Sequence, residues 1–79
     1  MITLENLALA NGRILIEKTE YRQIYKVLKV AQNVNYEGLK EKINAGDFVC
    51  ASEFIYLQLK IDDKVYYVIK PSEIYGVFK

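Results

Sequence analysis

The chain has no histidine and no tryptophan, and its 79 residues include one cysteine and one proline. Without histidine it lacks the commonest general base of enzymes and the commonest metal ligand in proteins. A single cysteine, Cys50, excludes an internal disulfide and a zinc site built from thiolates. We expect Cys50 to be buried and inert among its apolar neighbours, and we expect no cofactor or metal.

The chain also has little net charge and no long hydrophobic run. Eleven basic residues oppose ten acidic ones, which leaves a formal charge of +1 and no overall electrostatic argument for a nucleic-acid partner. Apolar runs such as RILIE (13–17) are far shorter than the roughly 20 residues that span a bilayer. The first residues, MITLENLALANG, carry no basic segment before the apolar ones, unlike a secretory signal. These features predict a cytoplasmic protein with no membrane partner.

What the sequence does contain is 52% hydrophobic residues, many of them β-branched or aromatic. We interpret residues 1–79 as a single folded domain of mostly all-β class, with five to six short strands. Alternation of Ile55, Leu57, Leu59 and Ile61 with polar residues predicts a strand with one buried side. The turn signals are an Asp62-Asp63 hairpin and a tight turn after Pro71 that Ser72 caps. The stretch 33–47 is expected to be a loop with at most one or two helical turns.

Closure into a small β-barrel, complete or nearly so, would remove the edges that such apolar strands otherwise expose. The order of parts resembles the GroES-like (chaperonin-10) co-chaperonin fold. The resemblance rests on "GRILIEK", "IYKVLKVAQN", the Gly-Asp pair of "INAGDFVCAS", the hairpin "LKIDDKVYYVIK" and the closing "PSEIYGVFK", and it covers roughly residues 12–79. It implies a GroES-like barrel and assembly of several copies.

Two segments depart from that family. Its first two strands flank a long, glycine-containing loop that grips the chaperonin ring, whereas this chain has only "KTEYRQ" there, without glycine. The segment "NVNYEGLKEK" is a compressed version of the family's roof hairpin. The resemblance therefore implies a degenerate relative, of the sort that a phage or mobile element carries, for which a chaperonin ring is not an expected partner.

Seven tyrosines exceed the needs of so small a core, and tyrosine has a large apolar body with a polar tip. Adjacent Tyr66 and Tyr67 face opposite sides of their strand, so one of them is expected outside. Three readings remain open: tyrosines that cover the barrel ends, anchors of a protein interface, or platforms that stack single-stranded nucleic acid. The candidate partner-binding surface consists of Tyr21, Arg22, Tyr25, Lys26, Tyr56 and Tyr66.

No catalytic arrangement is present in the sequence, because its serines have no histidine to activate them and its glycines are too far apart for a phosphate loop. We therefore expect a non-enzymatic protein-interaction module that associates with copies of itself. The alternatives are a small single-stranded nucleic-acid-binding barrel and an inhibitor of a host protein. Apolar residues near both termini imply a partner, and in GroES-like rings the first strand of one subunit pairs with the last strand of its neighbour. The candidate oligomer interface consists of Ile2, Leu4, Leu7, Tyr75, Val77 and Phe78.

Overall fold

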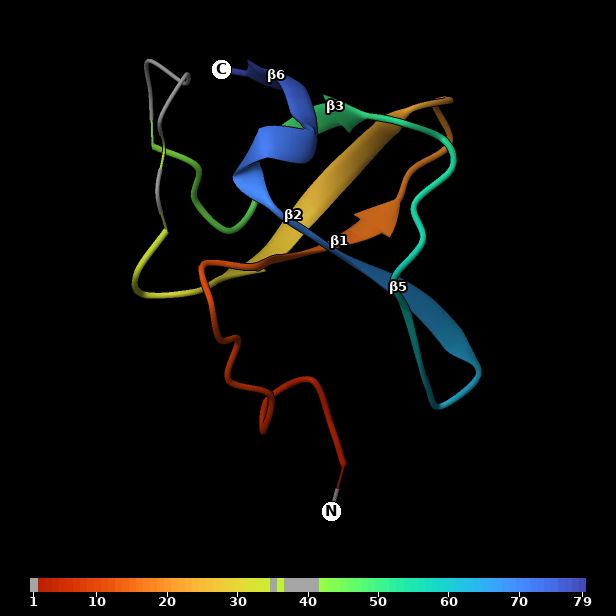
Figure 1. Cartoon of the computed structure of the whole chain (residues 1–79). Helices are drawn as coiled ribbons and strands as arrows, with labels where there is room; N and C mark the ends of the chain where they lie inside the picture. The colour runs from red at the N-terminus through yellow and green to blue at the C-terminus, as the bar shows by residue number, and fades with distance from the viewer. Residues whose placement is uncertain (1, 35, 37–41) are drawn as a thin grey trace.

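The computed structural model describes residues 2–34, 36 and 42–79, and this part of the chain is all-β (Figure 1). The β-branched and aromatic runs of the sequence form its strands, as their propensities favour. The six strands, all antiparallel to their neighbours, are β1 (Ile14–Lys18), β2 (Ile24–Val30), β3 (Phe48–Ala51), β4 (Gln58–Ile61), β5 (Lys64–Ile69) and β6 (Ile74–Phe78). A single 3-10 turn, η1 (Pro71–Glu73), precedes β6. The predicted all-β class with little helix is confirmed.

The strands form one sheet in the order β4-β5-β1-β2-β3-β6. Side chains from β1, β2, β3, β5 and β6 meet in one buried cluster, joined by Ile43 and Ile55 from the connections. One face of the sheet therefore curls around the core. Among the described residues, no ladder joins the end strands β4 and β6, so the sheet is not closed into the expected barrel. Within the described part of the chain, β4 and β6 each therefore have one edge without a strand partner.

A β-bulge in β2 determines which side chains of this strand face the core. Its two lysines interrupt the alternation of apolar and polar residues in the sequence. Ile14 pairs with Val30 and Ile16 pairs with Val27, so β2 contains one extra residue at this point. The extra residue shifts the alternation and places Lys26 and Lys29 on the same outer face. Tyr25 and Val27 then both point into the core, where each is at most 2% exposed.

The outer face of the sheet carries a second buried region. Leu15 on β1 is fully buried although it lies outside the main cluster, and Tyr66 on β5 is only 6% exposed. The N-terminal segment (residues 2–12) lies against this face, because Lys29 Nζ, beside Leu15 in the ladder, donates a hydrogen bond of 2.9 Å to the Leu7 carbonyl. Figure 1 shows this segment passing below β1. The prediction that either Tyr66 or Tyr67 is exposed is wrong, because β5 is covered on both faces at these two residues.

The β4–β5 hairpin forms as predicted at Asp62-Asp63, but its first strand is shorter. Both aspartates have positive φ angles, 50° and 66°, as the tight turn of a two-residue hairpin requires. β4 starts only at Gln58, and the expected alternation of buried and exposed side chains does not hold for the residues before it. Ile55 is 6% exposed and enters the core, whereas Leu57 is 50% exposed.

Two further local predictions concern the cap of the turn η1 and the helical turns in residues 33–47. At η1 the Glu73 carboxylate, not the Ser72 hydroxyl, accepts the hydrogen bond at the start of the turn, from the Lys70 backbone N–H at 3.0 Å. Proline at the first position of the turn is suited to it because its φ is preset. The helical turns considered for 33–47 fall mostly on residues 35 and 37–41, which lie outside the described part of the chain.

The end of β6 is tied to the turn before β3. Lys79 Nζ donates to the Lys42 carbonyl at 2.9 Å and to the Asp47 carboxylate at 2.7 Å, and that carboxylate also accepts the Asn44 backbone N–H. The hydrogen bond from Lys79, then the one from Asn44, lowers the pKa of Asp47 below its ordinary value. The ion pair therefore links β6 to the β2–β3 connection.

This link predicts a dependence of stability on pH. The folded-state pKa of Asp47 is depressed, so its contribution is complete above the unfolded pKa of about 4 and disappears as the pH falls through the folded value. We expect Asp47→Asn to lower the free energy of unfolding at pH 7 by no more than about 1 kcal/mol, as for a surface ion pair. Thermal melts from pH 7 to pH 2 should show the two proteins converging in acid; a constant difference would contradict this assignment.

Candidate functional site

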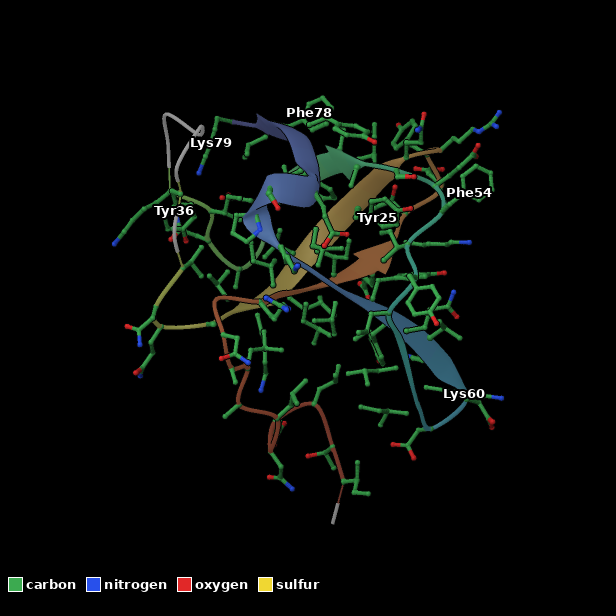
Figure 2. The ribbon with its side chains drawn as sticks, in the orientation of Figure 1. Tyr25, Tyr36, Phe54, Lys60, Phe78 and Lys79 are labelled. Atoms are coloured by element: carbon green, nitrogen blue, oxygen red, sulfur yellow. The ribbon has the colours of Figure 1, made fainter. Side chains whose placement is uncertain are left out.

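An apolar part of the described surface lies on the outer face of β2, β3 and β6. Val49 and Ala51 point into the core, so Phe48 points outward, where its ladder partner is Phe78. These two rings are 41% and 52% exposed. Together with the β1–β2 loop they line a shallow groove of about 500 Å³, whose lining residues are Thr19, Glu20, Tyr21, Ile24, Phe48 and Phe78. We call this groove the apolar groove; Phe78 lies at the top of the molecule in Figure 2.

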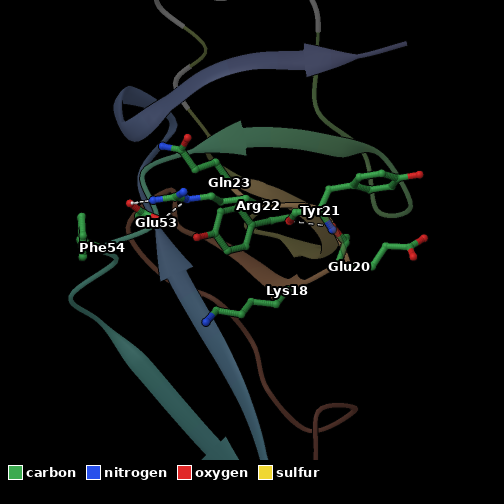
Figure 3. A pocket seen from close by; sticks show the side chains of 9 residues that line it. Lys18, Glu20, Tyr21, Arg22, Gln23, Glu53 and Phe54 are labelled. Atoms are coloured by element: carbon green, nitrogen blue, oxygen red, sulfur yellow. Dashed lines mark hydrogen bonds and ion pairs between the residues drawn. The ribbon is translucent and has the colours of Figure 1, made fainter.

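A second, more polar cavity of about 480 Å³ lies between the β1–β2 loop and the connection that follows β3 (Figure 3). Arg22 and Glu53 form a bidentate pair there, with Nε to Oε2 at 2.6 Å and an Nη atom to Oε1 at 2.8 Å. The pair raises the pKa of Arg22 and lowers the pKa of Glu53, in each case chiefly through the hydrogen bond. Lys18 and Arg22 are the basic residues that line this cavity, and Glu20 and Glu53 are the acidic ones, so it offers little net positive charge to a phosphate.

The connection between β3 and β4 displays aromatic side chains. Phe54 is 84% exposed and Tyr56 is 98% exposed, on either side of the buried Ile55. Tyr25 holds the start of this connection, because its hydroxyl donates to the Ser52 carbonyl at 2.8 Å. Burial raises the pKa of that phenol, and it is unavailable for acid–base chemistry near neutral pH. The connection is thus anchored at two points while its aromatic rings face solvent.

The predicted partner-binding residues do not form one surface. Tyr21, Arg22, Lys26 and Tyr56 are exposed, and the second cavity brings together Tyr21, Arg22 and Tyr25. Tyr25 and Tyr66 are buried, at 2% and 6% exposure, so neither offers contact area in this monomer. The sequence reasoning missed Phe48 and Phe54, although the inward positions of their neighbours Val49 and Ile55 would have placed both rings outside by strand parity.

The predicted oligomer residues lie in two separate places. Ile2 is 82% exposed, whereas Leu4 and Leu7 are half-buried, and Leu7 lies against the outer face of its own sheet. Tyr75 and Phe78 are exposed on β6, and Val77 is half-buried against the core. The two chain ends lie at opposite ends of the molecule in Figure 1. Of the two groups, only the residues on β6 adjoin the apolar groove.

Cys50 is half-buried rather than buried, on the outer face between β2 and β6. Its Sγ lies 3.7 Å from the Gly76 carbonyl oxygen. A Cβ on Gly76 would come within 3.2 Å of that sulfur, so glycine allows the two strands to pack at this point. The thiol fills space beside the apolar groove.

Within residues 2–34, 36 and 42–79, no group of three acidic or cysteine side chains is placed to hold a metal ion. No helix of this part of the chain is long and apolar enough to cross a membrane. No protein-family model matches the sequence, and a search of curated proteins finds no similar one. The resemblance to GroES-like proteins therefore stays a prediction that rests on the quoted residues.

Proposed function

We propose that this chain is a non-enzymatic protein-interaction module that associates with further copies of itself. The observation that carries the proposal is the apolar groove, where Phe48 and Phe78 lie side by side on an outer sheet face. Large aromatic side chains contribute most of their stabilising energy when they leave water. Contiguous exposed apolar patches on small domains mark interaction sites, and aromatic residues dominate the energy of such contacts.

The edges of the sheet support the same proposal. An open edge presents unpaired backbone N–H and C=O groups, which another strand can satisfy. The apolar groove reaches the open edge at β6, so a partner bound there would bury aromatic side chains and pair backbone groups together. Nothing in this arrangement requires a reacting group.

Two other partner classes receive less support. Single-stranded nucleic acid needs a basic groove with stacking aromatics, but Arg22 is paired with Glu53 beside the exposed Phe54. A chaperonin ring needs a mobile loop between β1 and β2, but Thr19 closes this connection tightly: its hydroxyl donates to the Ile24 carbonyl at 2.7 Å and accepts the Tyr21 N–H. Nucleotide-dependent co-sedimentation of this protein with a chaperonin would contradict the expectation that a chaperonin ring is not its partner.

Light scattering in line with gel filtration tests self-association. We expect the 79-residue chain at about 100 µM to have a mass that is a multiple of 9.2 kDa. Replacing Phe48 and Phe78 together by alanine should shift the mass towards the monomer, because both rings are exposed and their loss leaves the core intact.

Phe54→Ala is the matched control, since it removes another highly exposed ring away from the apolar groove. It should leave the mass unchanged. A wild-type protein that stays monomeric over the whole concentration range would remove the proposal of self-association.

A further inference from the structure

The open edge of β6 has a defined hydrogen-bonding pattern. On β3, the Ala51 N–H bonds the Gln23 carbonyl, and the Asp47 carbonyl accepts the Val27 N–H, so the odd-numbered residues of this strand face β2. In an antiparallel ladder successive residues point their backbone groups to opposite sides. The even residues Phe48 and Cys50 therefore bond β6, at Phe78 and Gly76. Val77, which lies between these two, directs its N–H and C=O to the open edge.

The two edges of the sheet differ in how they are protected. On β4, the Val68 N–H bonds the Leu57 carbonyl, so the same alternation directs the backbone groups of Gln58 and Lys60 to the open side. Lysine on an edge strand discourages pairing with another chain. From Ile74 to Phe78, by contrast, β6 has no charged residue and no proline. The edge that adjoins the apolar groove is thus the unprotected one.

Building on the proposed self-association, we propose that β6 pairs antiparallel with β6 of a second copy, with Val77 opposite Val77 across a two-fold axis. The two Val77 residues then exchange both of their backbone hydrogen bonds. This single alignment extends the sheet from one copy into the other. It also closes the contact at two copies, because each β6 has only one open edge.

The alignment is self-complementary on the outer face. It sets Phe78 of each copy opposite Gly76 of the other, and an aromatic ring that covers an edge glycine across a strand pair is a known stabilising arrangement. Phe78 of one copy would thereby continue the outer-face row of the other, in which Gly76 lies beside Cys50 and Cys50 beside Ile24. The exposed part of the Phe78 ring leaves water without any change in the core.

The charges near β6 do not oppose this alignment. Lys79, which follows the strand, keeps its ion pair with Asp47 of its own copy. Lys79 also comes opposite Tyr75, whose ring is 71% exposed. No like charges face each other in this alignment.

Proline substitution tests the edge directly. Proline is tolerated on an edge strand where the lost N–H faces solvent, so Val77→Pro removes the hydrogen bond of the dimer rather than one of the monomer. We expect a mass of twice 9.2 kDa for the wild-type protein and of 9.2 kDa for Val77→Pro. Lys60→Pro is the matched control, because its N–H faces the open edge of β4. It should leave the mass at the wild-type value.

A cross-link keeps the test decisive if the proline variant is poorly folded. In a Cys50→Ser background, Val77→Cys places two thiols on residues whose Cα atoms are about 5.5 Å apart in the proposed pair, within reach of a short thiol-specific bifunctional reagent. The reagent should give a cross-linked species of twice 9.2 kDa, and Lys60→Cys in the same background should not.

The outcomes separate this inference from the proposed function. An oligomer that keeps its mass in Val77→Pro, with no cross-link through Val77→Cys, overturns the β6 pairing while self-association stands. A wild-type protein that is monomeric by light scattering, with no cross-link, overturns both.

Discussion

Leu15→Ala should lower the free energy of unfolding by about 2–5 kcal/mol, the range for truncating a buried leucine. Leu15 is fully buried, but on the outer face of β1, outside the main core. The loss therefore reports on the second buried region beneath the N-terminal segment. Because small domains are stable by only about 5–15 kcal/mol, a loss of this size is a large part of the total. Urea unfolding followed by circular dichroism measures it.

Two further variants sharpen this test. Leu15→Val, with an expected loss of about 1 kcal/mol, stays measurable if the alanine variant does not fold. Val65→Ala is the matched surface control, since Val65 is 42% exposed on β5, and it should change stability by no more than about 0.5 kcal/mol. If Leu15→Ala costs no more than Val65→Ala, the outer face does not form a second core.

Ile55→Ala should likewise lower the free energy of unfolding by about 2–5 kcal/mol, whereas Tyr56→Ala should change it by about 0.5 kcal/mol or less. Ile55 is 6% exposed within the core cluster, and the neighbouring Tyr56 is 98% exposed. Ile55 inserts into the core from the connection between β3 and β4, between Phe54 and Tyr56, so its burial helps to fix the position of these two aromatic rings. Thermal and urea unfolding of both variants give the comparison.

Leu57→Ala tests whether Ile55 is buried because the connection inserts it into the core or because of simple strand alternation. Alternation alone puts Ile55 and Leu57 on one buried face and predicts similar losses for both. In the structure Leu57 is 50% exposed, so its truncation should cost clearly less than that of Ile55. Equal losses at the two positions would contradict the described course of this connection.

Local signals determine much of this fold. β-Branched and aromatic runs gave the positions of β1, β2 and β5, because strand preference and alternation act over neighbouring residues. Asp62-Asp63 was placed correctly as a hairpin turn, since aspartate tolerates the positive φ angles found there. Proline and the acidic residue after it marked the turn before β6. Each of these features depends on residues that are close together in the chain.

Only the tertiary structure decided which faces are covered and where the sheet ends. The bulge in β2 depends on pairing with β1, and it reassigns the faces of two lysines. The burial of Tyr66 and Leu15 depends on a second layer over the outer face, where the N-terminal segment lies. The apolar groove unites Ile24, Phe48 and Phe78 from three strands far apart in the sequence. Alternation along one strand separates its two faces, but it does not specify what packs against either of them, because that depends on contacts between distant segments.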